Sequence, residues 1–329
     1  MDQPARRAGM PTWVKILLLV LAIDAVGALA IVVVSMVFLL PLLHSGSLSG
    51  GFLGRIEDEP LFLVQLRANA GDSTAEADMG RRYYLGRGGV SRDDKQALAW
   101  LRKAADHGNA RGENYLALMY AAGRGVPRDD VAAVGWYQKA AAQNYAPAQA
   151  NLGRHYYLGL GVKRDDAAAL VLFQNSAAMR DPMAEDYLGI MYEYGRGVTR
   201  DPAQALAWYQ KSAAQGRAGG ECNLGAAYLH GVGTPVDYKQ AFYWLQKAAD
   251  HGNGRADHLI SMMYGKGLGV TADSTSAAAW DKKAQEAGYA LRASNTNAPP
   301  LPATIWDKTA PSTQLDSTNA PPASPTNAP

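Results

Sequence analysis

A 36-residue period runs through most of this 329-residue chain and constrains its fold more than any other feature. A tyrosine, a glycine, an aspartate and an alanine recur at that spacing in six successive units. A tryptophan recurs in five of the units, and Leu172 holds its place in the other. Such a period predicts a solenoid, in which each repeat buries its apolar face against its neighbours. Two of the recurring sets are Trp100, Trp136, Trp208, Trp244 and Trp280, and Asp93, Asp129, Asp165, Asp201, Asp237 and Asp273.

Each unit is predicted to contain two helices. The first carries apolar residues at helical spacing, as at Tyr115 and Met119, and ends at Gly123, where a residue without Cβ suits a left-handed cap. An aspartate such as Asp201 then begins the second helix, because its side chain accepts hydrogen bonds from the free N–H groups of the first turn. The tryptophan that follows, such as Trp208, is expected to fill a gap between stacked helices.

The period also sets the boundaries of the units. The first unit runs one residue ahead of the others until Gly89, which we interpret as an inserted residue. Upstream, residues 58–71 are predicted to form an N-terminal capping helix. The six repeats are predicted at 72–108, 109–144, 145–180, 181–216, 217–252 and 253–288.

The fourth unit carries the pattern most completely, with Leu188, Gly189, Tyr192, Gly195, Gly197, Val198, Asp201, Ala205, Trp208, Ser212, Ala213 and Gly216. This pattern resembles the Sel1-like repeat, which is related to the tetratricopeptide repeat. The resemblance implies an all-α fold, a right-handed α/α superhelical solenoid of helix-turn-helix repeats. It also implies an adaptor that binds proteins or assembles membrane-associated complexes.

An apolar run near the N-terminus predicts one transmembrane helix, at residues 16–43. Ile16 to Leu40 holds a single charge, Asp24, and about 25 helical residues are long enough for a bilayer core of about 30 Å. Asp24 is either a functional carboxylate within the span or a residue near the interface, if the span begins at Ala25. A cleaved signal peptide is the alternative, but its apolar core would be shorter.

The flanking cations predict the orientation of this helix. Arg6, Arg7 and Lys15 precede it, whereas Arg55 is the only cation in the next stretch. The positive-inside rule then keeps residues 1–15 in the cytoplasm and places the repeats outside it, in the periplasm if the membrane is a bacterial inner membrane. Residues 44–57 are expected to be a linker, and the Pro/Ala/Thr/Asn-rich residues 289–329 a disordered tail.

No motif in the sequence indicates catalysis, a cofactor or a metal. The chain has one cysteine, and acidic and basic residues nearly cancel at 30 against 32, so neither a cysteine zinc site nor a nucleic-acid interface is expected. His107 and His251 share a repeat phase before a closing glycine, which favours a role at terminal carbonyls over metal binding. We therefore predict that the protein is not an enzyme.

Two polar columns remain as candidates for binding. Lysines recur on the second helices, as at Lys211, and are interpreted as a solvated face whose charge suits the C-terminal end of the helix dipole. An acidic column on the first helices is either such a face or a partner-binding stripe. Its members are Glu113, Gln149, Glu185, Glu221 and Asp257.

The sequence therefore favours a membrane-anchored scaffold that binds a protein or peptide partner outside the cytoplasm. A solenoid suits extended partners, because it exposes a long surface. The alternative is a cell-envelope factor that binds or remodels peptidoglycan or exopolysaccharide.

Overall fold

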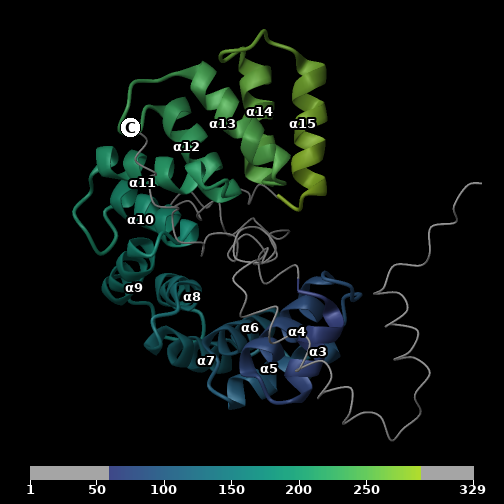
Figure 1. The fold of residues 1–329 in the computed structure, drawn as a ribbon. Helices are drawn as coiled ribbons and strands as arrows, with labels where there is room; N and C mark the ends of the chain where they lie inside the picture. The colour runs from purple at the N-terminus through teal and green to yellow at the C-terminus, as the bar shows by residue number, and fades with distance from the viewer. Residues whose placement is uncertain (1–58, 290–329) are drawn as a thin grey trace, which may run out of the picture. The chain divides into compact units, whose positions relative to one another are not determined.

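The structure, a computed structural model, describes residues 59–289, and Figure 1 shows the fold. Within these residues it contains thirteen helices and no strand, all in one compact unit that begins at Leu61. The predicted all-α solenoid is therefore confirmed. The predicted segments 1–15, 16–43, 44–57 and, apart from Tyr289, the tail 289–329 lie outside the described residues. No helix between residues 59 and 289 is both long and apolar enough to cross a bilayer.

Six helix pairs follow a lone first helix, α3 (Leu61–Asn69), which lies within the predicted capping segment. Every later helix has 13 residues. The first helices of the pairs are α4 (Ser73–Leu85), α6 (Ala110–Ala122), α8 (Ala146–Leu158), α10 (Pro182–Tyr194), α12 (Ala218–His230) and α14 (Gly254–Lys266). The second helices are α5 (Asp94–Asp106), α7 (Asp130–Ala142), α9 (Asp166–Ala178), α11 (Pro202–Ala214), α13 (Tyr238–Asp250) and α15 (Ser274–Glu286).

The caps expected from the sequence are present. Asp201 precedes α11, and its side chain accepts hydrogen bonds from the N–H groups of Ala203 and Gln204. The first helix α8 ends at Gly159, which has a φ of 70°. Two residues later, Gly161 lies so close to α7 that a Cβ would stand 2.1 Å from the carbonyl oxygen of Asp130. Glycine is required there both by its positive φ and by this close approach of two backbones.

The inserted residue of the first unit is located in a loop. Successive second helices begin 36 residues apart from α5 onward, whereas α4 begins 37 residues before α6. The extra residue therefore lies between α4 and α5, where Gly86, Gly88 and Gly89 all have positive φ. Because the loop absorbs the insertion, the helices of the first unit keep the same packing as the others.

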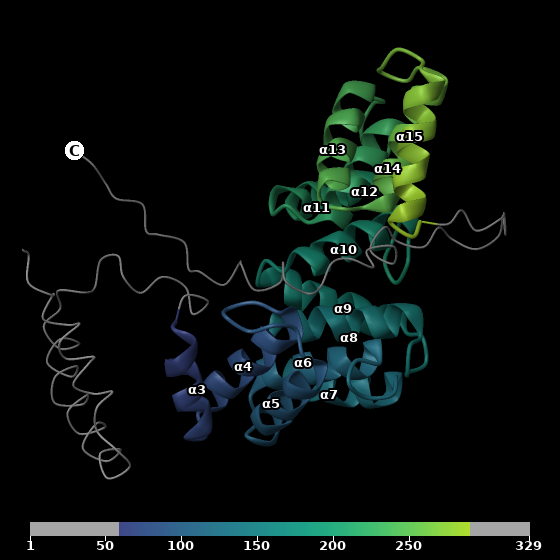
Figure 2. The ribbon, with the colours of Figure 1, turned by 90° about the vertical axis from the view of Figure 1, so that its right-hand side faces the viewer.

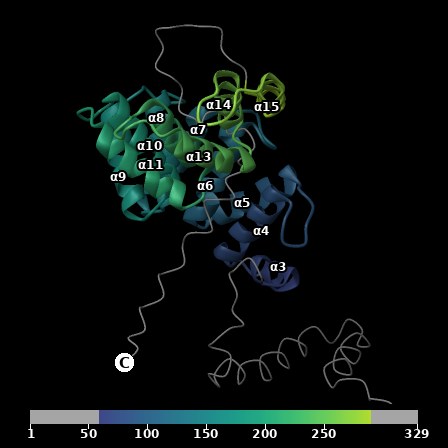
Figure 3. The same cartoon turned by 90° about the horizontal axis from the view of Figure 1, so that it is seen from above.

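Each helix packs against its neighbours in the chain, and the first helices also contact one another from unit to unit. Figure 1 shows α4, α6 and α8 on the inner side of this curved array, with α5, α7 and α9 outside them. Figures 2 and 3 show the pairs following in chain order, with α3 and α15 apart in every view. The array thus has an inner face built by first helices and an outer face built by second helices.

The tryptophan column fills the space between helices only in part. Trp136, Trp208 and Trp244 are partly buried at the edge of the core. In the first five units the next residue, such as Tyr137, Phe173 or Tyr209, is the fully buried one. The tryptophans therefore pack against the core as expected, but at its edge, and the centre of the core is held by the residue after them.

Candidate functional site

The acidic stripe predicted from the sequence lies near the N-terminal end of the first helices and is buried. Its five members have between 1% and 5% of their surface exposed. They are Glu113, Gln149, Glu185, Glu221 and Asp257. At such burial the stripe itself offers little surface to a partner, and its side chains make their contacts within the protein.

Three members of the stripe bind a side chain 30 residues further along, at the C-terminal cap of the second helix of the same unit. Glu113 accepts a hydrogen bond from Gln143 at 2.8 Å, and Glu185 accepts one from Gln215 at 2.7 Å. Glu221 lies 2.7 Å from Nδ1 of His251. Each carboxylate therefore ties the start of one helix to the end of its partner.

The first unit makes the same kind of contact through His107, which occupies the position equivalent to His251. Nδ1 of His107 lies 2.7 Å from Glu76, which precedes it by 31 residues because of the inserted residue. His107 and His251 are the C-terminal caps of α5 and α13, so they lie at helix ends as expected, but their side chains contact carboxylates rather than terminal carbonyls. Sequence reasoning missed these pairs because it compared equivalent positions of different units. The two members of each pair occupy different positions within one unit.

The third and sixth units do not form this pair of side chains, because each lacks the carboxylate that accepts or the side chain that donates. In the third unit the cap is Met179 and the stripe residue is Gln149, which donates to the Ala141 carbonyl at 3.4 Å. In the last unit the cap is Ala287, and burial raises the pKa of Asp257 to about 6. This correspondence within the chain supports a structural role for the stripe.

The lysine column lies on an exposed face of the second helices, and its lysines stack over the neighbouring tryptophans. Nζ of Lys139 lies 3.8 Å from the ring centroid of Trp136, and Nζ of Lys211 lies 3.7 Å from that of Trp208. A cation over an aromatic face is attracted by the negative charge of the π system. The tryptophans and lysines of the second helices thus form stacked pairs on the outer face.

The inner face holds a polar cavity that sequence reasoning missed. Gly189 of α10 approaches Tyr209 of α11, so it marks the side of α10 that faces its paired helix. Ile190 and Tyr194 lie about 100–140° further round at 3.6 residues per turn, away from that helix. They line a cavity of about 230 Å³. Its lining is completed by Glu193, Tyr209, Asn223, Ala226, Ala227, His230, Val232 and Arg255.

Hydrogen bonds across three units position the polar groups of this inner cavity. Tyr209 donates to Glu193 at 2.6 Å, which joins α11 to the end of α10. Arg255 of α14 donates to the side-chain oxygen of Asn223 at 2.7 Å. The amide of Asn223 in turn donates to the buried carboxylate of Asp186 at 2.8 Å. The guanidinium and the amide are therefore held in place from behind, as pre-organised binding groups are.

The electrostatics of the inner cavity combine both signs. Burial, and next the nearby Arg255, lower the pKa of His230, so this imidazole is largely neutral at pH 7. Burial raises the pKa of Asp186 against the opposing effect of Arg217. The inner cavity therefore brings together a cation, a carboxylate, an amide and an aromatic ring. The ring is that of Tyr194, which has 39% of its surface exposed. Such groups recognise peptide backbone and charged side chains.

The signal that would have found this cavity is a departure from the repeat. At the phase of Glu193 the other units carry Ala121, Tyr157, Leu229 and Gly265. Arg255 occupies a phase held by Gly219, Met183 and Pro147 in the three preceding units and by another arginine, Arg111, in the second unit. Positions that stay constant between units serve packing, whereas these inner positions change from unit to unit.

The described residues contain no group of three or more His, Cys, Asp or Glu side chains arranged to hold a metal ion. Cys222 is buried on α12. The inner cavity offers hydrogen-bonding groups and an aromatic ring to a ligand.

Comparison with known proteins agrees with this geometry. A solved Sel1 repeat protein from Oxalobacter formigenes is 32% identical, with a TM-score of 0.58, over 69% of this chain and 99% of its own. A protective antigen of uropathogenic Escherichia coli strains, which displays an SLR fold, is 35% identical, with a TM-score of 0.55, over 69% of this chain and 49% of its own.

A curated relative matches a shorter segment. The ERAD-associated E3 ubiquitin-protein ligase component HRD3A of Arabidopsis thaliana is 37% identical over 67 residues, which is 20% of this chain and 10% of that protein. The chain therefore spans a small part of the length of this relative.

The model of the Sel1 repeat family matches six segments, 73–109, 110–145, 146–181, 182–216, 218–253 and 255–289. They agree with the six helix pairs of the structure and cover more than half of the chain. The chain belongs to the Sel1 repeat family.

Proposed function

We propose that this protein is a membrane-anchored scaffold that binds an extended segment of a protein partner along the inner face of its first helices. Sel1 repeats generally mediate the binding of protein partners, and this chain has six of them. In the right-handed superhelix that the family resemblance implies, the inner face is a continuous groove, which suits an extended partner.

The inner cavity is the observation that carries this proposal. Most of its lining residues differ from the residues at the equivalent positions of other units, and Arg255 is held by a hydrogen bond to Asn223, which in turn donates to the buried carboxylate of Asp186. Desolvating polar groups costs free energy of folding. Polar groups fixed in this way are therefore typical of positions that serve recognition. The exposed ring of Tyr194 supplies an apolar contact beside them.

The anchoring and the side of the membrane are further parts of the proposal. They rest on the apolar run at residues 16–43 and on the cations Arg6, Arg7 and Lys15 before it. We infer that the repeats act outside the cytoplasm and without catalysis. A reporter that is active only in the cytoplasm, fused after Pro329, should be silent. Activity of this reporter would mean that the orientation is the opposite one.

The binding proposal is tested by comparing variants of the full-length protein. Partners recovered after cross-linking in membranes would be quantified for the wild type, for Arg255→Ala and for a matched control, Tyr243→Ala, on the outer face of α13. Tyr243 is 51% exposed, so its loss should not disturb the fold.

The proposal predicts that one protein partner is recovered with the wild type and with the control, and is reduced about tenfold by Arg255→Ala, as for a central interface residue. Equal recovery from all three, at equal helical content, would contradict the inner-face site. Sedimentation of the wild type with peptidoglycan in place of any protein would favour a cell-envelope factor instead.

A further inference from the structure

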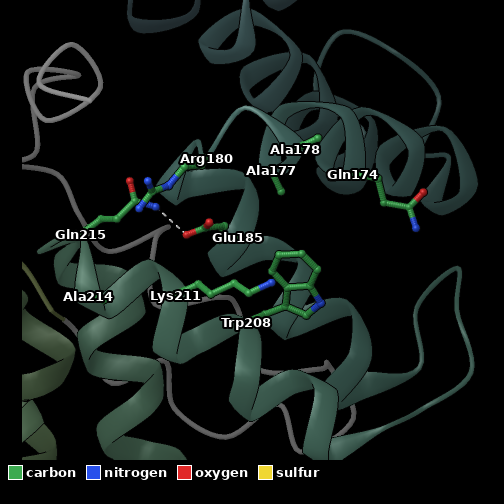
Figure 4. A pocket seen from close by; sticks show the side chains of 9 residues that line it. All are labelled: Gln174, Ala177, Ala178, Arg180, Glu185, Trp208, Lys211, Ala214 and Gln215. Atoms are coloured by element: carbon green, nitrogen blue, oxygen red, sulfur yellow. Dashed lines mark hydrogen bonds between the residues drawn. The ribbon is translucent and has the colours of Figure 1, made fainter. Parts of the chain in front are cut away.

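A second cavity lies on the opposite face, between the second helices α9 and α11, and encloses about 650 Å³ (Figure 4). Gln174, Ala177 and Ala178 of α9 form one wall, and Trp208, Lys211, Ala214 and Gln215 form the other. Glu185 lies at the base, and Arg180 lies on the turn that joins α9 to α10. We call this cavity the outer groove.

Arg180 occupies a backbone position that disfavours arginine. Its φ is 62°, and the equivalent positions of four other units hold glycines of positive φ, namely Gly108, Gly216, Gly252 and Gly288. A non-glycine residue with a left-handed backbone is strained unless surrounding structure fixes it, and such strain gathers at functional sites. Arg180 thus adds a guanidinium to the lining of the outer groove, at a position where four other units have no side chain.

The charges of the outer groove do not cancel. Arg180 and Lys211 are both exposed, and no carboxylate within residues 59–289 forms an ion pair with either of them. Lys211 instead lies over the ring of Trp208. Glu185 is buried and already accepts a hydrogen bond from Gln215, which Figure 4 shows as a dashed line. The outer groove therefore has two accessible cations and one carboxylate, which already accepts a hydrogen bond.

The equivalent groove between α5 and α7 differs in charge although it shares the same frame. It has the same tryptophan, lysine, carboxylate and glutamine, at Trp136, Lys139, Glu113 and Gln143. Asp106 replaces Ala178 at its rim, and Gly108 replaces Arg180. Its two cations, Arg102 and Lys139, are matched by Asp106 and Glu113, so no excess of positive charge remains.

The remaining grooves are likewise neutral or acidic at these positions. The pair α7 and α9 lacks the tryptophan and the lysine, because Leu172 and Asn175 take their places. Between α11 and α13, Lys247 faces Glu221 and Asp250, and between α13 and α15, Lys283 faces Asp250, Asp257 and Glu286. Five pairs of adjacent second helices can be compared in this way. Among them, only the outer groove combines alanine rims, an aromatic wall and a net positive charge.

We propose that the outer groove is a second binding site, which takes an acidic peptide segment of a partner protein. A carboxylate of the peptide lies between Arg180 and Lys211, because charge-assisted hydrogen bonds to these groups satisfy both cations. The apolar part of the same segment packs on Ala178, Ala214 and the edge of Trp208. The site is independent of the inner cavity, so a partner can occupy both faces of the solenoid.

The test uses full-length protein and a labelled probe, the peptide acetyl-Glu-Leu-Glu-Leu-Glu-amide, with its three glutamates replaced by glutamine as a matched probe. Fluorescence anisotropy measures the affinity. Fluorine NMR of 5-fluorotryptophan-labelled protein reports where the peptide binds, because Trp208 and Trp136 mark the two grooves that share a frame.

The acidic probe should shift the Trp208 signal and leave Trp136 unchanged. Arg180→Gly restores the residue of the regular repeat, so it should fold normally and weaken binding about tenfold, the loss of one charge-assisted contact. The double variant Asp106→Ala with Gly108→Arg should make Trp136 respond as well. Equal binding of the glutamine probe, equal shifts at both tryptophans, or an Arg180→Gly affinity within twofold of the wild type would each overturn the proposal.

Discussion

Truncation of Tyr209 tests how the repeats are held together. Its side chain is 1% exposed and packs so closely on α10 that a Cβ on Gly189 would stand 2.5 Å from the ring. Removing a buried aromatic side chain costs about 3–5 kcal/mol, from lost apolar burial and from the cavity that remains. Tyr209→Ala should therefore lower the free energy of unfolding by about that amount. Tyr209→Phe, which removes only the hydroxyl bound to Glu193, should cost about 1 kcal/mol.

Neighbouring positions provide the controls. Trp208 is partly buried beneath Lys211, so Trp208→Ala should cost about 1–3 kcal/mol, less than Tyr209→Ala. Tyr243→Ala, at a residue 51% exposed, should stay within about 0.5 kcal/mol of the wild type. The order Tyr209→Ala, Trp208→Ala, Tyr243→Ala follows from burial, although the tryptophan is the more regular feature of the sequence.

Urea unfolding monitored by circular dichroism would give the free energies, and hydrogen exchange would locate the damage. In a solenoid each unit contacts only its neighbours, so Tyr209→Ala should reduce protection mainly from α9 to α13. Protection lost evenly from α4 to α15, or a larger loss from Trp208→Ala than from Tyr209→Ala, would refute this account of the core.

Three further predictions concern the backbone and the charges. Arg180→Gly should raise the free energy of unfolding by about 1 kcal/mol, because glycine adopts a φ of 62° without strain, and a lower midpoint in urea would argue against strain there. Gly161→Ala should lower it by several kcal/mol (~3 or more), because its Cβ would overlap the Asp130 carbonyl, and an unchanged melting temperature would contradict that approach. Burial raises the pKa of Asp181 to about 6, so the folded state binds its proton more tightly than the unfolded state. The wild type should therefore lose stability relative to Asp181→Asn as the pH rises from about 4 to about 6, and parallel stability curves would exclude the shift.

The regular parts of the fold were predictable because they repeat. Each aspartate that caps a second helix and each glycine that ends a first helix satisfies a local requirement of the backbone. Six copies of the same requirement made the pattern plain, and even the inserted Gly89 was visible as a break in phase. The capping segment before the first repeat followed from the same reasoning.

The two cavities were not predictable in this way because they depend on residues that depart from the repeat. Glu193 and Arg255 lie 62 residues apart and meet only after three units have stacked. The buried stripe was assigned to a possible surface because phase alone does not tell which side of a helix faces its neighbour. Glu113 and Gln143 differ in phase, and only packing brings the end of α7 beside the start of α6.

The most direct test of the central claim is site-specific photo-cross-linking in membranes. A photoreactive phenylalanine would replace, one at a time, Tyr194 at the inner cavity and Tyr243 on the outer face of the full-length protein. Both side chains are exposed aromatics, so the replacements perturb the fold alike. The account predicts a cross-link to one protein partner from position 194, lost when Arg255→Ala is added, and no cross-link to that partner from position 243. A cross-link to the partner from position 243 alone, or from both positions regardless of Arg255, would contradict binding on the inner face.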